Sequence, residues 1–587
     1  MGAIDQEHVF LRMARPYAVI LQAGAASPFM PPAEGVDAPP AADAKPTAAA
    51  KPAPAPAATA VDPGDLERRT VVVPGVEAGD YFRLEATADG FLFLAQPKLH
   101  FEKYDAVTDH TSGELDLHHF VLAPEKPGDW KAEKLLSGLA NYHLSGDGKK
   151  LVYRAGGAYG VLDVGKEGKP GDGAVSLAAV KLKIDRRAEY LQIFDEAWRV
   201  QRDWFYDPGM HGLDWEATGA MYRKFVPDCG TRSDLVYLIG EMISELNAGH
   251  TYSYGGDEQT EPKQMGVGLL GADFEWPAGS DYPRVAHVVP GFNWSEDEVS
   301  PLAAPDCPIR AGDYLIAVDG QRFTPRENLY APLEGKAGRV VTLTYNSRPD
   351  AAGAKTCRVR TVASEAAIRY REWVEAKRAY VERASGGRVG YVHLPDMGAS
   401  GLREFGRAFH AQHTKEAMIV DDRYNSGGFV GDMILDRMER RLWAVGQARE
   451  GKPGRFPEGV FDGHYALLIN EDTGSNGEYF AEAIKIRGLA RSFGMRTWGG
   501  AVGIEVHQPL VDGGTCTPPQ FAIYDRQRRW LIEGRGVEPD VAVQNQPGEV
   551  LKGVDAQLDA ALAYLRERMA AEPKALPPVP EYPRKAK

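Results

Sequence analysis

Cysteine, long apolar runs and excess positive charge are all scarce in this sequence, and each shortage excludes a class of protein. The 587 residues include four cysteines, 68 lysines and arginines, and 82 aspartates and glutamates, which gives a formal net charge of −14. Because phosphate binding depends on lysine and arginine, this balance argues against a nucleic-acid partner. No apolar run approaches the ~18 residues of a membrane-spanning helix, so no membrane partner is expected.

The few cysteines are also widely spaced, and no pair forms a C-x-x-C motif. They are Cys229, Cys307, Cys357 and Cys516. Neither a zinc site nor a disulfide framework is therefore expected, and no metal or other cofactor is predicted. The first 30 residues carry Asp5 and Glu7 ahead of their apolar residues, which is a poor match to a secretion signal.

What the sequence does contain is typical of a multidomain globular protein. Hydrophobic residues make up 43% and charged residues 26%. The chain is too long for one core, and about three or four domains are expected. Residues 31–65 consist largely of alanine and proline, which predicts a flexible or polyproline-like linker.

The stretch before residue 165 has the pattern of a β-rich region. Short alternating runs recur between turns, as in Gly90-Phe-Leu-Phe-Leu94 and the turn Ser145-Gly-Asp-Gly148 before Lys149-Lys-Leu-Val-Tyr-Arg154. This rhythm resembles that of β-propeller blades. There is enough chain for two blades, whereas a propeller needs at least about four. We therefore expect an open or partial arrangement, or a chain that begins partway through a longer ancestor.

Helices and then a second β-rich region follow. Three helices are predicted over residues 186–206, 215–225 and 232–246. The last ends at Asn247-Ala-Gly-His-Thr-Tyr252, so His250 lies just beyond a helix C-terminus, where a structural cap is the ordinary interpretation. Strands are predicted across residues 265–362, beginning with residues 265–270. Ile309-Arg-Ala-Gly-Asp-Tyr-Leu-Ile-Ala-Val-Asp-Gly320 closely resembles the central hairpin of PDZ domains, which implies a groove for an extended peptide, or else a spacer of the same fold.

From Val389 strands alternate with helices, which predicts an α/β domain with two glycine-rich turns. Asn425-Ser-Gly-Gly428 follows one buried strand. Gly474-Ser-Asn-Gly477 follows the strand at residues 465–469 and precedes a helix. Ser475 thus lies where a strand turns into a helix N-terminus, whose amides stabilise negative charge. This is suitable geometry for a nucleophile, although the motif is not G-x-S-x-G and a helix N-cap serine is the simpler alternative.

A nucleophilic serine needs a base, a group that orients the base, and donors for the oxyanion. The two turns and His250 supply candidates. In combination, five motifs resemble the tricorn-type serine peptidases, a branch of the tail-specific protease superfamily. They are Gly240-Glu-Met-Ile-Ser-Glu-Leu-Asn-Ala-Gly-His250, Val420-Asp-Asp-Arg-Tyr-Asn-Ser-Gly-Gly-Phe429, Gly474-Ser-Asn476, Arg496-Thr-Trp-Gly-Gly500 and Gly536-Val-Glu-Pro-Asp540.

The resemblance implies a role for five residues. Ser475 would be the nucleophile and His250 the general base, while the amides of Gly427 and Asn476 would form the oxyanion hole. Glu533 would be the distant acid of the family's tetrad.

Two positions depart from the family pattern. Gly249 stands where the family often has a serine that links base to acid, so Glu533 must reach His250 directly or through water. Asn476 replaces a frequent aspartate, but only its amide is needed. Related C-terminal processing peptidases use a lysine base, for which Lys485 is the nearest candidate, and histidine is the better interpretation here.

The resemblance also implies a domain division. We expect strands of a partial propeller in residues 1–30, a linker in 31–65, partial propeller blades in 66–185, the helical part of the peptidase core in 186–262, a PDZ-like domain in 263–363, the α/β catalytic core in 364–570 and a proline-rich tail in 571–587. Peptides would be the substrates, and the family suggests a homo-oligomer (a hexamer) and a cytoplasmic location, with the periplasm as an alternative.

Three functions compete at this point. The first is a serine peptidase that hydrolyses oligopeptides. The second is a PDZ-type peptide-binding module whose catalytic site has decayed, for which Gly249 is the main argument. The third is a small-ligand binder, because a fold alone does not fix a function.

Overall fold

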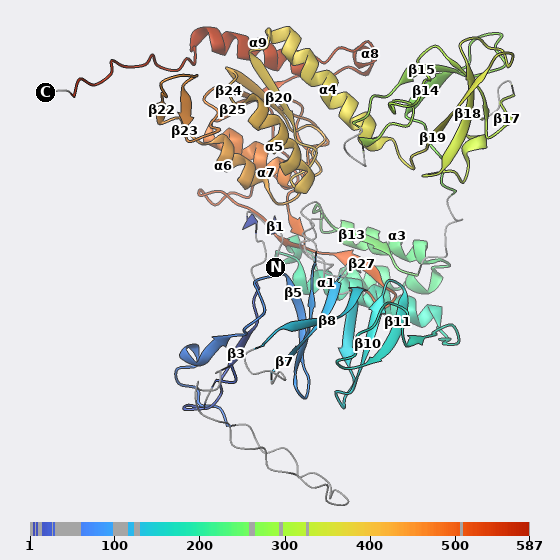
Figure 1. The fold of residues 1–587 in the computed structure, drawn as a ribbon, viewed down its shortest axis with the longest axis vertical. Coiled ribbons are helices and arrows are strands. Elements are labelled where there is room, and N and C mark those ends of the chain that lie inside the picture. Colours follow the sequence, from blue (N-terminus) through green and yellow to red (C-terminus); the bar gives the residue numbers. More distant parts are fainter. Residues whose placement is uncertain are drawn as a thin grey trace, which may run out of the picture. The chain divides into compact units, whose positions relative to one another are not determined.

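The chain forms two compact units, Met1–Asp185 and Arg186–Lys587, and each is described by itself (Figure 1). The computed structural model describes residues 4–5, 8–9, 14–25, 27–29, 60–97, 115–122, 129–257, 265–292, 298–324, 328–504 and 509–585. Most of the predicted linker, residues 31–59, lies outside these ranges. Within them, no helix is both long enough and apolar enough to cross a membrane.

Antiparallel sheets make up the first unit. Its elements are β1 (Ile4–Asp5), β2 (His8–Val9), β3 (Tyr17–Val19), the 3₁₀ turn η1 (Glu67–Arg69), β4 (Thr70–Val72), β5 (Tyr81–Ala86), β6 (Gly90–Ala95), β7 (Leu115–Val121), β8 (Ala132–Leu139), β9 (Asn141–Leu144), β10 (Lys150–Ala155), β11 (Ala158–Asp163) and β12 (Ala174–Val175). Two four-stranded sheets, in the orders β5-β6-β7-β8 and β12-β11-β10-β9, dominate. Leu117 from the first and Tyr153 from the second belong to one shared core. Neither sheet closes on itself within the described residues.

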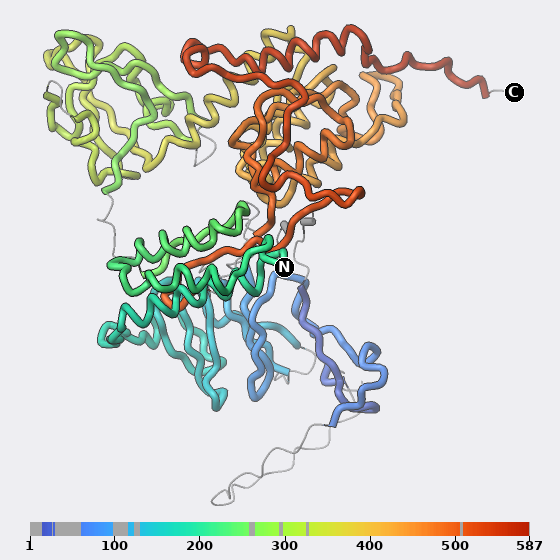
Figure 2. Tube along the Cα trace, turned by 180° about the vertical axis from the view of Figure 1, so that it is seen from behind, coloured from blue at the N-terminus to red at the C-terminus, as the bar shows by residue number. Residues whose placement is uncertain are grey.

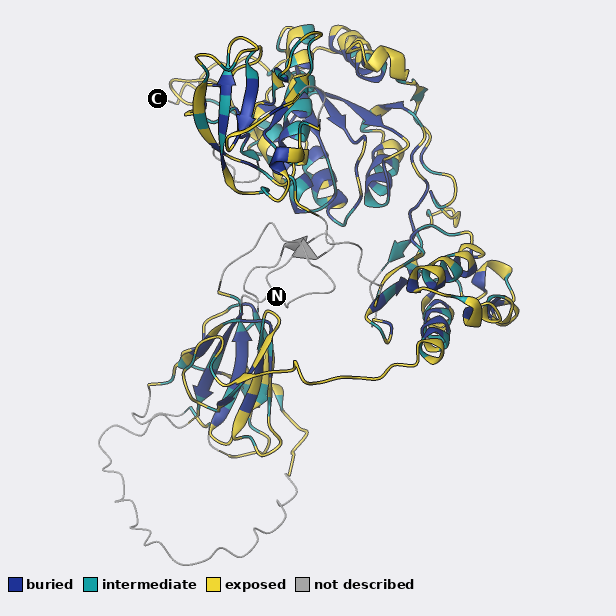
Figure 3. Cartoon of the chain, turned by 90° about the vertical axis from the view of Figure 1, so that its right-hand side faces the viewer, coloured by how far each residue is buried: buried dark blue, intermediate teal, exposed yellow. Residues whose placement is uncertain are grey.

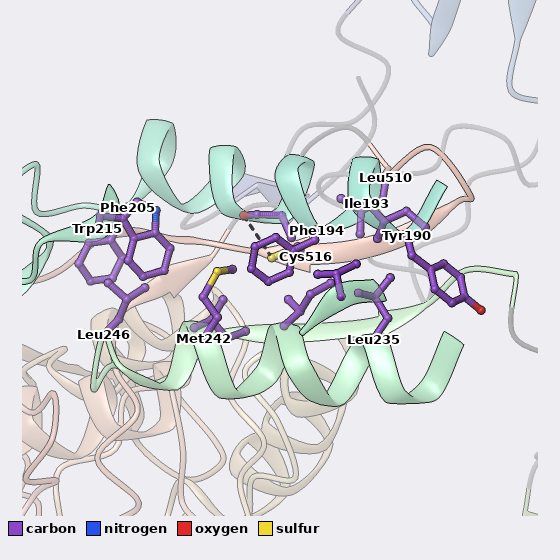
Figure 4. Close-up of a cluster of buried hydrophobic side chains, with 14 of the residues drawn as sticks. Tyr190, Ile193, Phe194, Phe205, Trp215, Leu235, Met242, Leu246, Leu510 and Cys516 are labelled. Atoms are coloured by element: carbon purple, nitrogen blue, oxygen red, sulfur yellow. Dashed lines mark hydrogen bonds between the residues drawn. The ribbon is translucent and has the colours of Figure 1, made fainter. Parts of the chain in front are cut away.

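A helical part opens the second unit. It comprises α1 (Arg186–Trp204), η2 (Met210–Gly212), α2 (Trp215–Arg223), η3 (Val226–Asp228) and α3 (Arg232–Ser244). Their apolar faces meet in a core that includes Phe194 and Met242, as helical spacing of the apolar residues predicts (Figure 4). Leu510 and Cys516 enter the same core from a segment far along the chain, so this late segment is anchored to the helices.

The β-rich part contains one six-stranded sheet. Its strands are β14 (Ala272–Glu275), β15 (Arg284–Val288), β16 (Tyr314–Val318), β17 (Gln321–Arg322), β18 (Val340–Asn346) and β19 (Lys355–Arg360), with the 3₁₀ turn η5 (Ala331–Leu333). The strand predicted over residues 265–270 is wrong, because this segment makes only two isolated bridges, at Val267 and Leu269. The physical reason is that the two bridges join different segments, Val267 to Glu334 and Leu269 to Val362, so no continuous ladder forms with one partner strand.

A parallel sheet forms the centre of the α/β part. Its order is β20 (Val389–His393), β21 (Ala417–Asp421), β24 (His464–Ile469), β25 (Ala490–Gly494) and β29 (Val541–Ala542). The helices are α4 (Ala366–Ser385), α5 (Ala399–Gln412), α6 (Gly431–Met438), α7 (Asn476–Arg487), α8 (Pro547–Val550) and α9 (Ala556–Ala571). Helices α4 and α9 pack on one face of the sheet, and α5, α6 and α7 lie on the other (Figure 1). Strands β20, β21 and β24 are buried throughout (Figure 3), as continuous apolar runs predict.

Short two-stranded ribbons complete the unit. They are β13 (Tyr252–Gly255) with β27 (Gly514–Thr517), β22 (Ala444–Gly446) with β23 (Gly454–Phe456), and β26 (Gly503–Ile504) with β28 (Pro519–Phe521). Between β25 and β29 the chain leaves the central sheet, pairs with β13 next to the helical part, and returns (Figure 2). This excursion connects the segment that follows α3 to the central sheet.

Candidate active site

Two turns leave the carboxyl ends of neighbouring parallel strands and are joined to each other. Strand β21 leads into the turn with Asn425, and β24 leads into the turn with Ser475. The Gly474 amide donates to the Asn425 carbonyl at 2.9 Å, and the Thr473 hydroxyl donates to the Asp422 carbonyl at 2.8 Å. The carboxyl edge of a parallel sheet is where such folds place their ligands. Both glycine-rich turns predicted from the sequence therefore lie together at this edge.

Ser475 precedes α7 in a backbone conformation that a serine rarely adopts, with φ 52° and ψ −124°. Non-glycine residues with positive φ are strained and are found where surrounding structure enforces them, often at functional sites. Ser475 occupies the N-cap position of α7 in a capping box with Glu478, and its Oγ also lies 3.2 Å from Nε2 of His250. The N-cap interpretation therefore holds for the position of Ser475, and the contact with His250 is one that a helix cap alone does not require.

His250 also has a positive φ, of 57°, and its position is set by the β13–β27 ribbon. The Thr517 hydroxyl donates to the His250 carbonyl at 3.0 Å and accepts from the Tyr252 amide at 3.0 Å. The indole of Trp498 lies beside the imidazole, with ring centroids 5.3 Å apart. The helical part thus supplies His250, which follows α3, and the central sheet supplies Ser475, which follows β24.

The surroundings of His250 favour a neutral imidazole. The residue is 8% exposed, and this burial lowers the pKa of His250, while the negative charge of Glu533 opposes the shift. A neutral ring near pH 7 has one nitrogen free to accept a proton. Its other nitrogen, Nδ1, is buried and has no hydrogen-bond partner in the described part of the chain. His250 can therefore accept a proton from Ser475, but no described hydrogen bond to Nδ1 orients the imidazole.

Glu533 lies close to His250 yet binds backbone. Its Oε1 accepts from the Gly249 amide at 2.6 Å, and its Oε2 accepts from the amides of Ala501 at 2.8 Å and Val502 at 3.0 Å. No hydrogen bond to His250 is found among the described contacts. A β-carbon on Gly249 would lie 3.0 Å from the Gly500 Cα and 3.2 Å from Glu533 Oε1, so the glycine permits this close approach.

The two predicted oxyanion donors differ in availability. The Asn476 amide opens α7 and has no hydrogen-bond partner among the described residues, while the Asn476 side chain accepts from the Gly431 amide at 2.9 Å. Gly427 touches the serine: a β-carbon there would lie 2.5 Å from the Ser475 β-carbon, and its φ of 84° also favours glycine. Its amide, however, donates to Asn425 Oδ1 at 2.8 Å.

Two further residues of the site were not found from the sequence. Glu478 is completely buried, and burial raises the pKa of its carboxyl while four hydrogen bonds oppose that shift. Its position three residues after Ser475 is the S-x-x-E pattern of an ordinary capping box, which hid any other role. Trp498 belongs to one of the five motifs, but nothing in the sequence placed it beside His250. Lys485, the alternative base, donates to the Glu538 carbonyl at 2.7 Å.

The described residues hold no metal-binding cluster, and a large cavity of the second unit lies away from the Ser475–His250 pair. Across the ranges that the structure describes, no three His, Cys, Asp or Glu side chains gather where they could hold a metal ion. A cavity of about 780 Å³ is lined by His464 and Ala490, the residues that begin β24 and β25. Ser475 follows the opposite end of β24, so this cavity does not belong to the Ser475–His250 site.

Family models match three parts of the second unit. Residues 388–543 match peptidase family S41, residues 186–244 match the tricorn protease C1 domain, and residues 268–364 match the tricorn protease PDZ domain. The chain therefore combines a PDZ domain with an S41 peptidase domain in a multidomain fold.

Relatives agree with this assignment. Tricorn protease homolog 1 of Streptomyces coelicolor is 35% identical over 592 residues, which cover 98% of this chain and 54% of the relative. The tricorn protease of Thermoplasma volcanium is 30% identical over 502 residues, which cover 85% of this chain and 47% of the relative. A crystal structure of the tricorn protease superposes with a TM-score of 0.81 at 28% identity, covering 95% of this chain and 51% of that chain. This chain spans about half the length of these relatives. The chain is a homologue of the tricorn proteases, and its residues 388–543 match peptidase family S41.

Proposed function

We propose that this chain is a serine peptidase that hydrolyses peptide bonds of oligopeptides. The observation that carries the proposal is the 3.2 Å contact between Ser475 Oγ and His250 Nε2, with Ser475 held in a strained conformation at the N-terminus of α7. Two residues 225 positions apart in sequence are brought together with the geometry of a nucleophile and its base. Ser475 is only partly buried, so a peptide carbonyl can reach it.

In the proposed reaction Ser475 Oγ attacks the carbonyl carbon of the scissile bond as its proton passes to His250 Nε2. The carbonyl π electrons move to oxygen, and amides at the two turns stabilise that oxyanion. Collapse breaks the C–N bond, and His250 gives its proton to the leaving amine. Water, activated by His250, then hydrolyses the acyl-enzyme. The lowered pKa of His250 suits the first step, because the ring is neutral when the substrate arrives.

For the oxyanion donors we propose Asn476 and Gly427, as the family resemblance implies. The Asn476 amide is placed at a helix N-terminus, where the helix dipole adds to the hydrogen bond. Gly427 can serve if its amide turns from Asn425 Oδ1 or shares its hydrogen when the oxyanion forms. Because the neighbouring Gly428 amide has no hydrogen-bond partner among the described contacts, it is a second candidate in the same turn.

Glu533 acts, on this proposal, through its charge and through the backbone of Gly249. The sequence left a direct link and a water-mediated link from Glu533 to His250 open, and the water-mediated link, at Nδ1, stays a prediction. The buried Nδ1 supports it, because a buried polar nitrogen ordinarily has a partner.

The remaining domains fit the same activity. We propose that the two open sheets of residues 66–185 are propeller blades, and that the PDZ domain offers its sheet edge to extended peptides. The predicted domain boundaries, a homo-oligomer (a hexamer) and a cytoplasmic or periplasmic location follow from the family and stay predictions.

A fluorophosphonate probe tests the proposal, since it reacts covalently with activated serines. The wild-type chain should be labelled stoichiometrically and should cleave fluorogenic oligopeptides, while Ser475→Ala should do neither. Ser244→Ala, at the exposed end of α3, is the matched control and should be labelled normally. A folded wild-type chain that binds peptides but is neither labelled nor active would instead support the decayed peptide-binding module.

A further inference from the structure

One loop connects the two halves of the Ser475–His250 pair. We call residues 497–502, between β25 and β26, the strap. Four consecutive amides of the strap donate to two carboxylates: those of Gly499 and Gly500 to Glu478, and those of Ala501 and Val502 to Glu533. A run of backbone donors shared in this way fixes the strap at both ends.

Glu478 is the carboxylate on the serine side. Its Oε2 accepts from the Ser475 amide at 3.1 Å and from the Gly500 amide at 3.0 Å. Its Oε1 accepts from the Gly499 amide and the Thr497 hydroxyl, both at 2.6 Å. All four hydrogen bonds are donated to the two oxygens of this one side chain, so it joins Ser475 to the strap.

Glu533 makes the corresponding connection on the histidine side. It binds the strap through Ala501 and Val502, and it binds the Gly249 amide, one residue before His250. The path from Ser475 to His250 therefore runs through Glu478, the strap and Glu533. Each step of this path is a hydrogen bond from backbone or from the buried Thr497 hydroxyl to one of two carboxylates, the fully buried one of Glu478 or the partly buried one of Glu533.

Both members of the pair need such support. Ser475 and His250 have positive φ values of 52° and 57°, and a non-glycine residue keeps such a strained conformation only where its surroundings enforce it. Glu478 accepts a hydrogen bond from the amide of Ser475, so it acts directly on the backbone of the strained residue. Releasing this bond would allow Ser475 to relax and its hydroxyl to leave Nε2.

We propose that Glu478 is a positioning residue: it holds the strained backbone of Ser475 and, through the strap and Glu533, sets the distance between Ser475 and His250. This inference rests on the proposed peptidase function and names a residue beyond the predicted tetrad.

An ordinary helix cap does not account for these contacts. An acid at the third helical position that only caps a helix accepts from the N-cap amide alone. Glu478 is fully buried and directs three of its four hydrogen bonds to the strap. Burying a carboxylate is costly, and the strap supplies the donors that offset the cost.

The test compares Glu478→Gln with Glu482→Gln. Glutamine keeps the shape but has one oxygen, so at least one backbone N–H loses its acceptor. Glu482 lies one turn further along α7, is only partly buried and makes no hydrogen bond among the described contacts, so the same chemical change there is the control.

The first readout is the labelling of Ser475 by a fluorophosphonate, measured with folded protein over a range of probe concentrations. We expect the maximal labelling rate constant of Glu478→Gln to fall about 100-fold, since misplacement by about 1 Å costs that much, while the probe's half-saturation concentration stays within about threefold. Glu482→Gln should match the wild type. A purely stabilising role would lower the melting temperature and leave the labelling rate of the folded protein unchanged, which would overturn the proposal.

The second readout does not depend on activity. Hydrogen exchange should accelerate about tenfold or more at whichever of the Gly499 and Gly500 amides loses its acceptor in Glu478→Gln, since the two bind different oxygens of Glu478, and the Glu482→Gln protein should exchange as the wild type does. Unchanged exchange would overturn the connection between Glu478 and the strap. If the wild type is neither labelled nor active but Glu478→Gln still accelerates this exchange, the peptidase proposal fails while the strap connection stands.

Discussion

Ser475 and His250 are held in different ways, although both are strained and both depend on the strap. Ser475 lies between a buried strand and a helix, and the fully buried carboxylate of Glu478 accepts a hydrogen bond from the Ser475 amide. His250 lies in a loop after α3 and is fixed through its carbonyl and through the amide of its neighbour Gly249. No described contact orients its ring from the Nδ1 side.

This difference separates the two functions of a catalytic pair. A nucleophile has to be in one place, and backbone hydrogen bonds achieve that. A base has to be in one place and in one tautomer, and only a partner at its second nitrogen fixes the tautomer. The chain therefore has a fully supported nucleophile and a base that is supported in position but not in tautomer.

The largest expected effect is loss of the base. His250→Gln removes the proton acceptor beside Ser475 Oγ, and kcat/KM for a fluorogenic oligopeptide should fall by about 10⁴ or more. Lys485→Ala is the control, because Lys485 is the alternative base but its Nζ donates to the Glu538 carbonyl. Activity lost in the lysine variant and kept in the histidine variant would reverse the assignment of the base.

The sequence predicted the parts of this site that local structure determines. Ser475 was found because an apolar strand, a small-residue turn and a helical pattern follow one another, and these are local properties. His250 could be placed only through the family resemblance, because the ribbon that positions it is formed with residues about 260 positions later. Glu478 was hidden because its spacing to Ser475 equals that of a common cap, and only the folded strap distinguishes the two.

The second effect concerns Glu533 and should be intermediate. Glu533→Gln weakens the hydrogen bonds to Gly249 and the strap, but it breaks no direct bond to His250 among the described contacts. We expect kcat to fall roughly ten- to hundredfold, through misplacement of the base. A direct carboxylate–histidine bond would instead predict a loss of about 10⁴. Steady-state kinetics on the purified variant distinguish these outcomes, and a loss near 10⁴ would show that Glu533 reaches the ring during catalysis.

The pH profile tests the charge of Glu533 separately. Burial lowers the pKa of His250 below its ordinary 6.5, and the Glu533 carboxylate raises it in part. The acid limb of kcat/KM should therefore lie below pH 6.5 in the wild type. Removing the carboxylate lowers the pKa of His250 further, so the acid limb of Glu533→Gln should move to lower pH. A shift to higher pH, or no shift, would contradict an electrostatic role for Glu533.

The smallest effect is expected at Gly249, where the family often has serine. A β-carbon there would lie 3.0 Å from the Gly500 Cα and 3.2 Å from Glu533 Oε1, so any side chain must move the strap by a few tenths of an ångström. Gly249→Ala carries this steric effect alone and should lower kcat by a few-fold, because it disturbs the strap that both halves of the site share. Gly249→Ser adds a hydroxyl able to join Glu533 to His250 Nδ1, and a hydrogen bond to a charged group contributes about 1.5–3 kcal/mol. The serine variant should therefore be about tenfold more active than the alanine variant, at ~1.4 kcal/mol per tenfold, and should end close to the wild type or above it. Equal activities of the two variants would mean that tautomer control at Nδ1 contributes nothing here, and that positional support alone suffices for this base.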